Sequence, residues 1–268
     1  MAQELAAGKL VLDEPAEAVA RLRINNPAKR NALDHDILNA LAEVLPQLDR
    51  GIEVRCVVVT GSEGHFSAGY DIGSISEETL VREAQSLVAH PFHAAIEGLA
   101  AHPWPTLAAI SGDCLGGGLE LAVTCDLRIC SGEARLGMPP VKLGLIYGHT
   151  GLRRFLDTIG LARTKELFLT GRNIGAQRAR EIGLVLDVVG EKELEASAIE
   201  LAAEIASSAP LSLKGNKRAI ETLNANPNLQ PQQEDELIEL REASISSEDF
   251  REAITAFAEK RKPRWRGR

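Results

Sequence analysis

The sequence contains little cysteine, with four in 268 residues. Cys56, Cys114, Cys125 and Cys130 form no Cys-x-x-Cys pair, and neither their spacing nor that of the scattered histidines suits a metal site. Two of them stand inside apolar runs, which is typical of buried thiols in a reducing compartment. We therefore expect a cytoplasmic protein with no disulfide framework and no metal site.

Long apolar runs and excess positive charge are also missing. No window approaches the length of a membrane span, and the first residues, 1–8, lack the apolar core of a signal peptide. The net charge of −8 argues against sequence-independent binding to nucleic acid. With 44% hydrophobic and 25% charged residues, the composition is that of an ordinary globular chain with enough length for a large core.

Apolar periodicity predicts strands and helices in alternation, which favours an α/β fold. Expected strands cover 10–12, 18–24, 54–60, 106–110 and 127–130, with a turn at 13–15, a helix from Asp34 and a long helix over 81–101. From Gly151 onward the pattern becomes mostly helical, with expected helices at 152–159, 162–169, 176–182, 191–207, 210–223, 233–245 and 247–260. The chain thus divides into an α/β part and a helical C-terminal part.

A glycine turn stands between the apolar strand 106–110 and the helix that follows it. Its sequence is Gly116-Gly117-Gly118-Leu119-Glu120. Glycine lets another group approach the backbone closely, and a helix start leaves N–H groups without partners. Such a turn can bind an anion or stabilise one that forms during a reaction. The alternative is a glycine turn that serves packing alone.

Three motifs in this order resemble those of the crotonase superfamily, also called the enoyl-CoA hydratase/isomerase family. They are residues 26–33 (Asn-Pro-Ala-Lys-Arg-Asn-Ala-Leu), 66–72 (Phe-Ser-Ala-Gly-Tyr-Asp-Ile) and the glycine turn. The resemblance covers nearly the whole chain. It implies a spiral core of ββα units over 1–200 that holds the coenzyme A site. It also implies a helical C-terminal region over 201–268 that contacts coenzyme A and forms homotrimers or dimers of trimers.

The resemblance also implies an enolate chemistry. In the family, two backbone N–H groups hold the thioester oxygen as the acyl-CoA becomes an enolate, and the matching positions here are Tyr70 and Gly117. Because the donors belong to the backbone, the side chain at Tyr70 is permissive. Glu120 matches a glutamate that acts as an acid or base in hydratases of the family. The alternative for Glu120 is a carboxylate that only favours a helix start.

One position departs from the hydratase pattern and changes the expected reaction. The family's hydratases carry a second glutamate where this chain has Pro140, which cannot transfer a proton. Tyr147 resembles a tyrosine of the superfamily's methylmalonyl-CoA decarboxylases, although a histidine commonly stands in that subgroup where this chain has Tyr70. Because loss of carbon dioxide creates the enolate without a general base, we expect decarboxylation of a methylmalonyl-CoA-like substrate, with Tyr147 orienting the departing carboxylate.

Several alternatives stay open at this stage. The first is an enoyl-CoA hydratase or isomerase that uses Glu120, with Tyr147 or His149 as its helper. The second is a non-catalytic or RNA-binding member of the fold, which the acidic balance disfavours. For Tyr147 itself, the alternative to a catalytic role is a plain core aromatic residue.

The resemblance implies that coenzyme A enters as part of the substrate and that no other cofactor is bound. The anionic nucleotide end of coenzyme A requires cations. By the resemblance, Lys29 and Arg30 contact the nucleotide and pyrophosphate, and Lys260 contacts coenzyme A from a basic end, 260–266, in which Trp265 can stack on adenine. The alternative for this end is a solvated tail. The full set of expected substrate-binding residues is Lys29, Arg30, Ala32, Ala68, Gly69, Asp71, Ile72, Gly116, Pro139 and Lys260.

Overall fold

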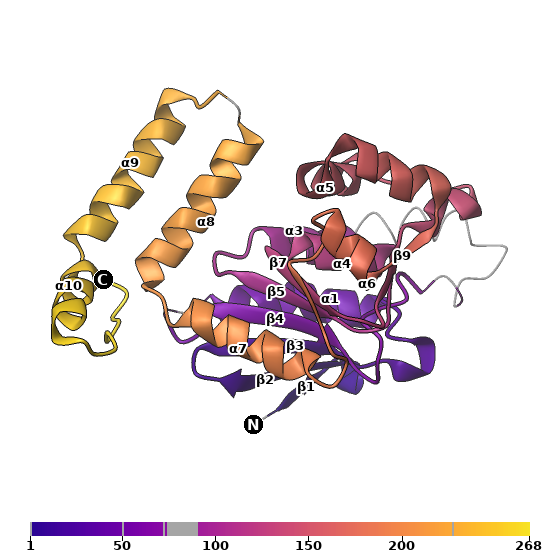
Figure 1. The fold of residues 1–268 in the computed structure, drawn as a ribbon, viewed down its shortest axis with the longest axis horizontal. Helices are drawn as coiled ribbons and strands as arrows, with labels where there is room; N and C mark the ends of the chain where they lie inside the picture. The colour runs from indigo at the N-terminus through magenta and orange to yellow at the C-terminus, as the bar shows by residue number, and fades with distance from the viewer. Residues whose placement is uncertain (1, 50, 72, 74–90, 227) are drawn as a thin grey trace.

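The computed structural model describes residues 2–49, 51–71, 73, 91–226 and 228–268, and its centre is a seven-stranded sheet (Figure 1). The order is β1-β2-β3-β4-β5-β7-β10, antiparallel from β1 to β3 and parallel from β3 to β10. The strands are β1 (Gln3–Leu5), β2 (Leu10–Ala16), β3 (Val19–Ile24), β4 (Cys56–Gly61), β5 (Thr106–Ile110), β7 (Leu127–Ser131) and β10 (Asp187–Val189). The inner parallel strands are almost fully buried, as expected for a sheet covered on both faces.

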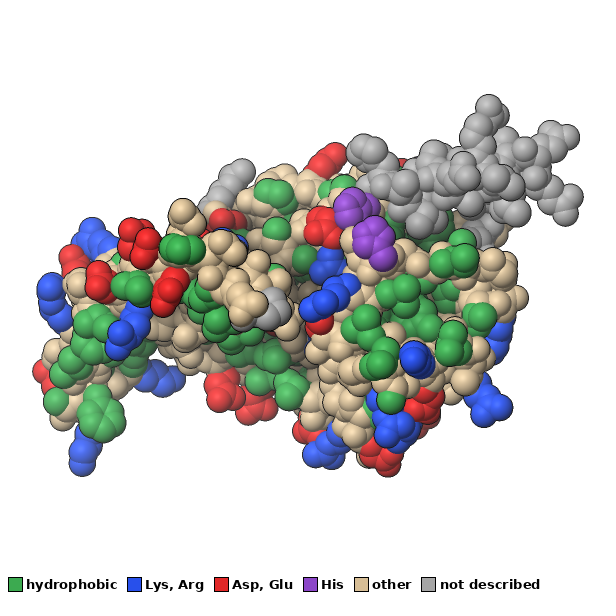
Figure 2. Space-filling view, turned by 90° about the horizontal axis from the view of Figure 1, so that it is seen from above, with side chains coloured by type: hydrophobic (Ala, Val, Ile, Leu, Met, Phe, Trp, Pro, Cys, Tyr) green, Lys and Arg blue, Asp and Glu red, His purple; other side chains and the backbone are tan. Residues whose placement is uncertain are grey.

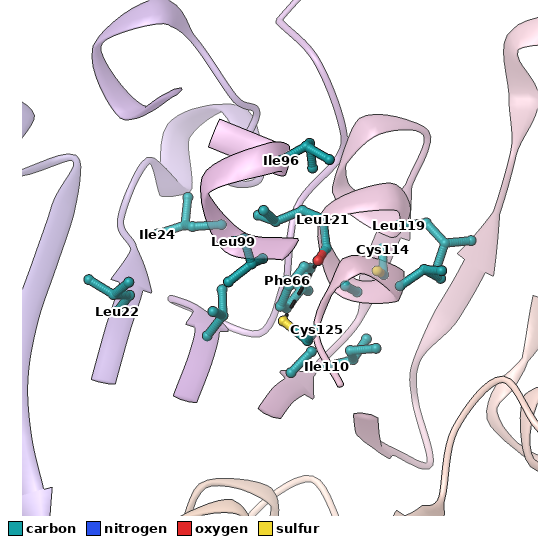
Figure 3. Close-up of a cluster of buried hydrophobic side chains, with 14 of the residues drawn as sticks. Leu22, Ile24, Phe66, Ile96, Leu99, Ile110, Cys114, Leu119, Leu121 and Cys125 are labelled. Carbon is teal, nitrogen blue, oxygen red and sulfur yellow. Dashed lines mark hydrogen bonds between the residues drawn. The ribbon is translucent and has the colours of Figure 1, made fainter. Parts of the chain in front are cut away.

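Helices cover both faces of this sheet. On one face lie α1 (His35–Val44), α3 (His93–Ala100) and α4 (Gly117–Thr124), and on the other lies α7 (Leu194–Ala206). Figure 3 shows the larger core, in which side chains of β3, β5, α3 and α4 gather around Phe66. Phe66 is the first residue of the second motif and is fully buried, so the core itself fixes where that motif begins.

A second, three-stranded sheet holds the start of α4. It has the order β6-β8-β9, with β6 (Asp113–Leu115) parallel to β8 (Arg135–Gly137) and β8 antiparallel to β9 (Asn173–Gly175). Strand β6 leads directly into α4. Helices α5 (His149–Thr170) and α6 (Ala176–Glu181) follow, and α5 is broken at Gly160, where φ is 72°.

The last three helices extend away from the sheets (Figure 1). They are α8 (Pro210–Ala225), α9 (Pro231–Ser246) and α10 (Glu248–Glu259). Figure 2 shows hydrophobic side chains at the surface of this part of the molecule. The exposed ones are Ile220, Leu223, Ile238, Leu240, Ile245, Phe250, Ile254 and Phe257. The expected oligomer and the expected boundary at residue 200 stay predictions.

Most expected elements are present, and the differences have local reasons. Helix α1 begins as expected, with Asp34 Oδ1 accepting a hydrogen bond of 3.0 Å from the Ile37 N–H. The turn expected at residues 13–15 is wrong, because β2 continues to Ala16 through a bulge and the chain turns at Ala18, where φ is 56°. Strands β1 and β9 have three residues each, too few for alternation to reveal them.

Two further expectations concern the membrane and the long helix. Within the described ranges, no helix is long and apolar enough to cross a membrane. The helix expected over 81–101 falls partly on residues outside the described part of the chain, and the described part contains α3.

Candidate active site

Two loops meet where β4 and β6 end. Ser67 N–H donates to Asp113 O at 2.9 Å, and Leu115 N–H donates to Ser67 O at 3.0 Å. This bridge brings Tyr70 and Gly117 together. A Cβ built on Gly117 would lie 3.6 Å from the Tyr70 nitrogen, and a Cβ built on Gly69 would lie 3.4 Å from the Gly117 nitrogen.

The conformation of Gly69 makes this approach possible. Its φ is +99°, and a Cβ there would lie only 2.7 Å from Leu115 O. Leu33 fixes the backbone on both sides of Tyr70, because its N–H donates to Gly69 O at 2.8 Å and its carbonyl accepts from Asp71 N–H at 3.0 Å. In the described part of the chain, the N–H groups of Tyr70 and Gly117 donate no hydrogen bond. Two neighbouring donors are therefore available for one acceptor.

The side chain of Tyr70 anchors its loop. Its hydroxyl forms a hydrogen bond of 3.0 Å with Nε2 of His35, and its ring meets Phe92 edge-on with centroids 6.4 Å apart. Burial, followed by the nearby carboxylates Asp71 and Asp34, raises the pKa of Tyr70 to about 12. The phenol therefore stays neutral, and only the backbone amide of this residue is free to act on a ligand.

Glu120 is a buried carboxyl group in the first turn of α4, with 5% of its surface exposed. The hydroxyl of Tyr147, which precedes α5, donates a hydrogen bond to its Oε2. Burial raises the pKa of Glu120, while the bond from Tyr147 and the charge of Arg154 oppose that rise. Burial and the adjacent carboxylate hold the pKa of Tyr147 well above its usual value, so Tyr147 keeps its proton.

Gly151 is the residue of α5 that packs against Glu120 and Tyr147, and it was not among the residues expected from the sequence. It is buried in the first turn of α5. A Cβ there would lie 2.7 Å from Cε1 of Tyr147 and 2.8 Å from Oε1 of Glu120. Only glycine lets the helix approach both groups so closely. The sequence signal was a small residue in a helix start close to Tyr147.

A pair of charged side chains on the two helices that pack against α4 was also missed. Nη2 of Arg154, on α5, lies 2.5 Å from Oε1 of Glu97, on α3. His93 Nδ1 lies 3.9 Å from the same oxygen. No motif marks these residues, which stand 57 positions apart in the sequence.

The expected coenzyme A cations near the first motif are engaged in ion pairs. Nζ of Lys29 lies 2.6 Å from Oδ2 of Asp71, so two expected binding residues meet. Nη1 of Arg30 lies 3.0 Å from Oδ2 of Asp113, a fully buried carboxylate that Arg135 also contacts. Either cation would have to share its charge with a phosphate.

The other expected binding residues of the motifs lie around the two donors or beside them. Ala68 N–H donates to Arg30 O at 2.9 Å, and Ala32 N–H donates to Lys29 O at 3.1 Å. Gly116 caps α4 and donates to Gly137 O at 2.9 Å, two residues before Pro139. Ile72 lies outside the described residues.

The basic C-terminal end is not close to this site in the same chain. Helix α10 lies on the opposite side of the molecule from α5 (Figure 1), because the α8–α9 hairpin carries it away. Arg261 is paired with Glu252 and Glu259, and the Trp265 indole donates to Ser207 O at 2.6 Å. Contact of Lys260 or Trp265 with coenzyme A stays a prediction that would require a neighbouring chain.

Two other positions that the sequence linked to proton transfer are Pro140 and His149. Pro140 is buried in a short 3-10 helix over Pro139–Leu143 and has no group that transfers a proton. His149 is exposed at the first position of α5 and has no hydrogen-bond partner among the described residues.

Comparison with known proteins gives a consistent result. Residues 14–268 match the family model described as enoyl-CoA hydratase/isomerase. The short-chain-enoyl-CoA hydratase of Clostridium acetobutylicum is 37% identical over 94% of this chain and 95% of its own. The 2,3-dehydroadipyl-CoA hydratase of Escherichia coli is 33% identical over 94% and 96%. A crystal structure of an enoyl-CoA hydratase from Bacillus anthracis superposes with a TM-score of 0.87, at 34% identity, and covers 97% of this chain and 100% of that one.

These relatives correct the expected reaction. They are named hydratases, whereas the sequence analysis favoured a decarboxylase. The structure supplies a physical reason, because the hydroxyl expected to orient a departing carboxylate is bonded to the protein's own Glu120. Tyr147 therefore does not mark decarboxylation here.

The comparisons confirm the expected fold, with its central sheet and C-terminal helices. The family model covers the three motifs, the two adjacent amides and the buried carboxyl group in one continuous match. This chain belongs to the enoyl-CoA hydratase/isomerase family.

Proposed function

We propose that the protein adds water across the double bond of a 2-enoyl-CoA thioester. In this reaction the amides of Tyr70 and Gly117 bind the thioester oxygen, and Glu120 transfers the proton. One observation carries the proposal: a buried carboxyl group stands one helical turn beyond one of two adjacent N–H groups that have no partner in the described chain. Three residues of helix rise only about 4.5 Å, so the carboxyl group starts close to the place where the two N–H groups would hold the thioester oxygen.

The proposed steps balance with one water molecule. The two N–H groups polarise the thioester carbonyl, so C3 becomes electrophilic. The water oxygen attacks C3 and passes a proton to Glu120, and the charge moves to the thioester oxygen as an enolate. Glu120 then returns a proton to C2, which gives the 3-hydroxyacyl thioester and restores the carboxylate. The raised pKa of Glu120 supports both halves of this transfer near neutral pH.

Pro140 makes Glu120 the sole carboxylate assigned to the transfer and favours a second candidate function. A shift of the double bond from C3 to C2 requires removal of a proton from C2 and its return to C4. One carboxylate does both without water. The same site therefore also suits an enoyl-CoA isomerase.

The acyl group is proposed to be short. The ring of Phe92 lies close to Gly117, since a Cβ on that glycine would be 3.0 Å from Cε2 of Phe92. Phe92 also meets the ring of Tyr70. The two rings narrow the space beside the N–H groups, and one relative carries the name of a short-chain hydratase.

The test uses the purified full-length protein with crotonyl-CoA, its eight- and twelve-carbon homologues, and a 3-enoyl-CoA. Hydration appears as a mass gain of one water, and the short substrate should turn over fastest. A double-bond shift without mass gain from the 3-enoyl thioester would identify the isomerase instead. Glu120→Gln should remove either activity and leave the melting temperature near that of the parent. The proposal would be overturned if none of these thioesters turned over, or if Glu120→Gln kept full activity.

A further inference from the structure

Two charged side chains reach toward each other beside the helix that carries Glu120. Arg154 projects from α5 and Glu97 from α3, and both helices pack against α4. The pair links them through Nη2 and Oε1 at 2.5 Å. The ion pair therefore ties together two helices that contact the carrier of the proposed acid and base.

Arg154 also shares a face of α5 with the seat of Glu120. It stands three residues after Gly151, one turn along the helix on the same side. The backbone at Gly151 lies so close to Glu120 and Tyr147 that a Cβ there would come within 2.8 Å of both, so an ion pair at Arg154 holds this turn against them. The Arg154 side chain is 21% exposed, and its Nε is buried without a partner in the described chain, so Glu97 is its principal anchor.

The two charges act on Glu120 in opposite senses. The positive charge of Arg154 favours the ionised carboxylate, and the negative charge of Glu97 disfavours it. His93 lies on α3 beside Glu97 and adds positive charge when it is protonated. Together with Tyr147, these are the titratable groups that act on Glu120 among the described residues.

We propose that Arg154 and Glu97 are positioning residues for this reaction. Their ion pair seats the first turn of α5 against Glu120, and their opposite charges offset each other at that carboxyl group. This inference rests on the proposed function, in which Glu120 handles the proton. Neither residue is assigned contact with substrate.

The test compares Arg154→Gln with Glu97→Gln, since both variants break the same ion pair. A pair with only a structural role would give both variants the same effect. We expect opposite shifts of the acid limb of the kcat profile, upward by about 0.5 pH units in Arg154→Gln and downward by about as much in Glu97→Gln. The sign follows because loss of a positive charge makes the ionised carboxylate less favourable, and loss of a negative charge makes it more so.

Three controls sharpen the comparison. Arg154→Lys keeps the charge and should restore the parent profile. Arg153→Gln removes a neighbouring cation that pairs with Asp157 on the exposed side of α5, and it should shift nothing. The variants are repeated in a His93→Gln background, where no imidazole lies beside Glu97.

A carbon-detected NMR titration of Glu120 without substrate separates this inference from the proposed function. The Glu120 signal is assigned by its loss in Glu120→Gln. Opposite shifts of its titration midpoint in the two variants support the positioning role, even if no enoyl thioester reacts. Shifts in the same direction, or none larger than in Arg153→Gln, overturn it, even if hydration is confirmed.

Discussion

The phenol of Tyr147 donates its hydrogen bond to the buried carboxyl group of Glu120, across 27 positions of sequence. Two opposing effects meet at that carboxyl group. Burial disfavours the charged form, and the hydrogen bond favours it, with burial the larger effect. A carboxyl group with a raised pKa serves as both base and acid near neutral pH, which one group must do if it alone handles the proton.

Removal of the phenol should therefore make Glu120 harder to ionise. In Tyr147→Phe we expect the acid limb of the kcat/KM profile to move to higher pH, because the hydrogen bond to the ionised form is lost. A shift of one unit, which corresponds to about 1.4 kcal/mol, would lower the rate by about tenfold at pH values on the acid limb and leave the plateau rate unchanged. The measurement is a pH profile for enoyl thioester turnover.

Phe168→Leu is the control for this change. The ring of Phe168 packs edge-on against Tyr147, with centroids 5.5 Å apart, so the control disturbs packing and keeps the hydrogen bond. It should leave the acid limb where it is. An unshifted profile in Tyr147→Phe would remove the phenol from the mechanism.

The proposed role of the Gly117 N–H can be isolated by two substitutions at the same site. Gly117→Pro and Gly117→Ala both add a Cβ, which would lie about 3.0 Å from Cε2 of Phe92, and only proline removes the N–H. Position 117 is the first of α4, where proline is tolerated. We expect Gly117→Pro to lose a factor on the order of 10² to 10³ in kcat relative to Gly117→Ala. Equal rates in the two variants would exclude this amide as the oxygen's donor.

Local motifs predicted the parts of the site that are close in sequence. The glycine turn begins α4 and carries Gly117 and Glu120 on one helical turn, as expected, although the three-residue strand β6 stands unpredicted between β5 and the turn. The strand before the second motif and the Asp34 helix start were likewise readable, because each depends on a few adjacent residues. These signals determine short distances only.

Contacts between segments far apart in the chain could not be predicted from the sequence. Pro140 and Tyr147 suggested a decarboxylase. The absence of a second glutamate at position 140 does not reveal that Tyr147 packs against the remaining carboxylate, Glu120. The phenol meets Glu120 only because α5 packs on α4, and Arg154 meets Glu97 only because both helices contact α4. Periodicity identifies which face of a helix is apolar, and not which charged residues will meet across three helices.

The close packing at Gly151 predicts that a substitution there lowers activity while the protein still folds. Gly151→Ala adds a Cβ that would meet Tyr147 at 2.7 Å and Glu120 at 2.8 Å, so one of them must move. Helix propensity favours alanine over glycine by about 1 kcal/mol, which offsets part of that strain. We expect a loss of at least about tenfold in kcat with a change of only a few degrees in the melting temperature, consistent with the sensitivity of catalysis to small misplacements.

Gly148→Ala is the matched control, since it adds the same methyl group three residues earlier where nothing lies within 4 Å. Its kcat should equal that of the parent. A Gly151→Ala variant as active as Gly148→Ala would show that the carboxyl group tolerates a different seat.

His102 gives a prediction about stability at low pH, away from the site. It is 3% exposed, and burial, followed by the charge of Lys217, lowers its pKa from 6.5 to about 4. Between pH 6.5 and about 4, His102 is therefore protonated in the unfolded chain and neutral in the folded chain. Stability from this group is lost as the pH falls below about 6.5, and the loss reaches at most about 3 kcal/mol near pH 4.

Urea unfolding of the parent and of His102→Gln between pH 7 and 4.5 measures this loss, and the parent should lose more stability than the variant as the pH falls. His149→Gln, which removes an exposed histidine, should follow the parent at every pH. A constant difference between the parent and His102→Gln over this range would mean that the buried imidazole accepts its proton as readily as a free one.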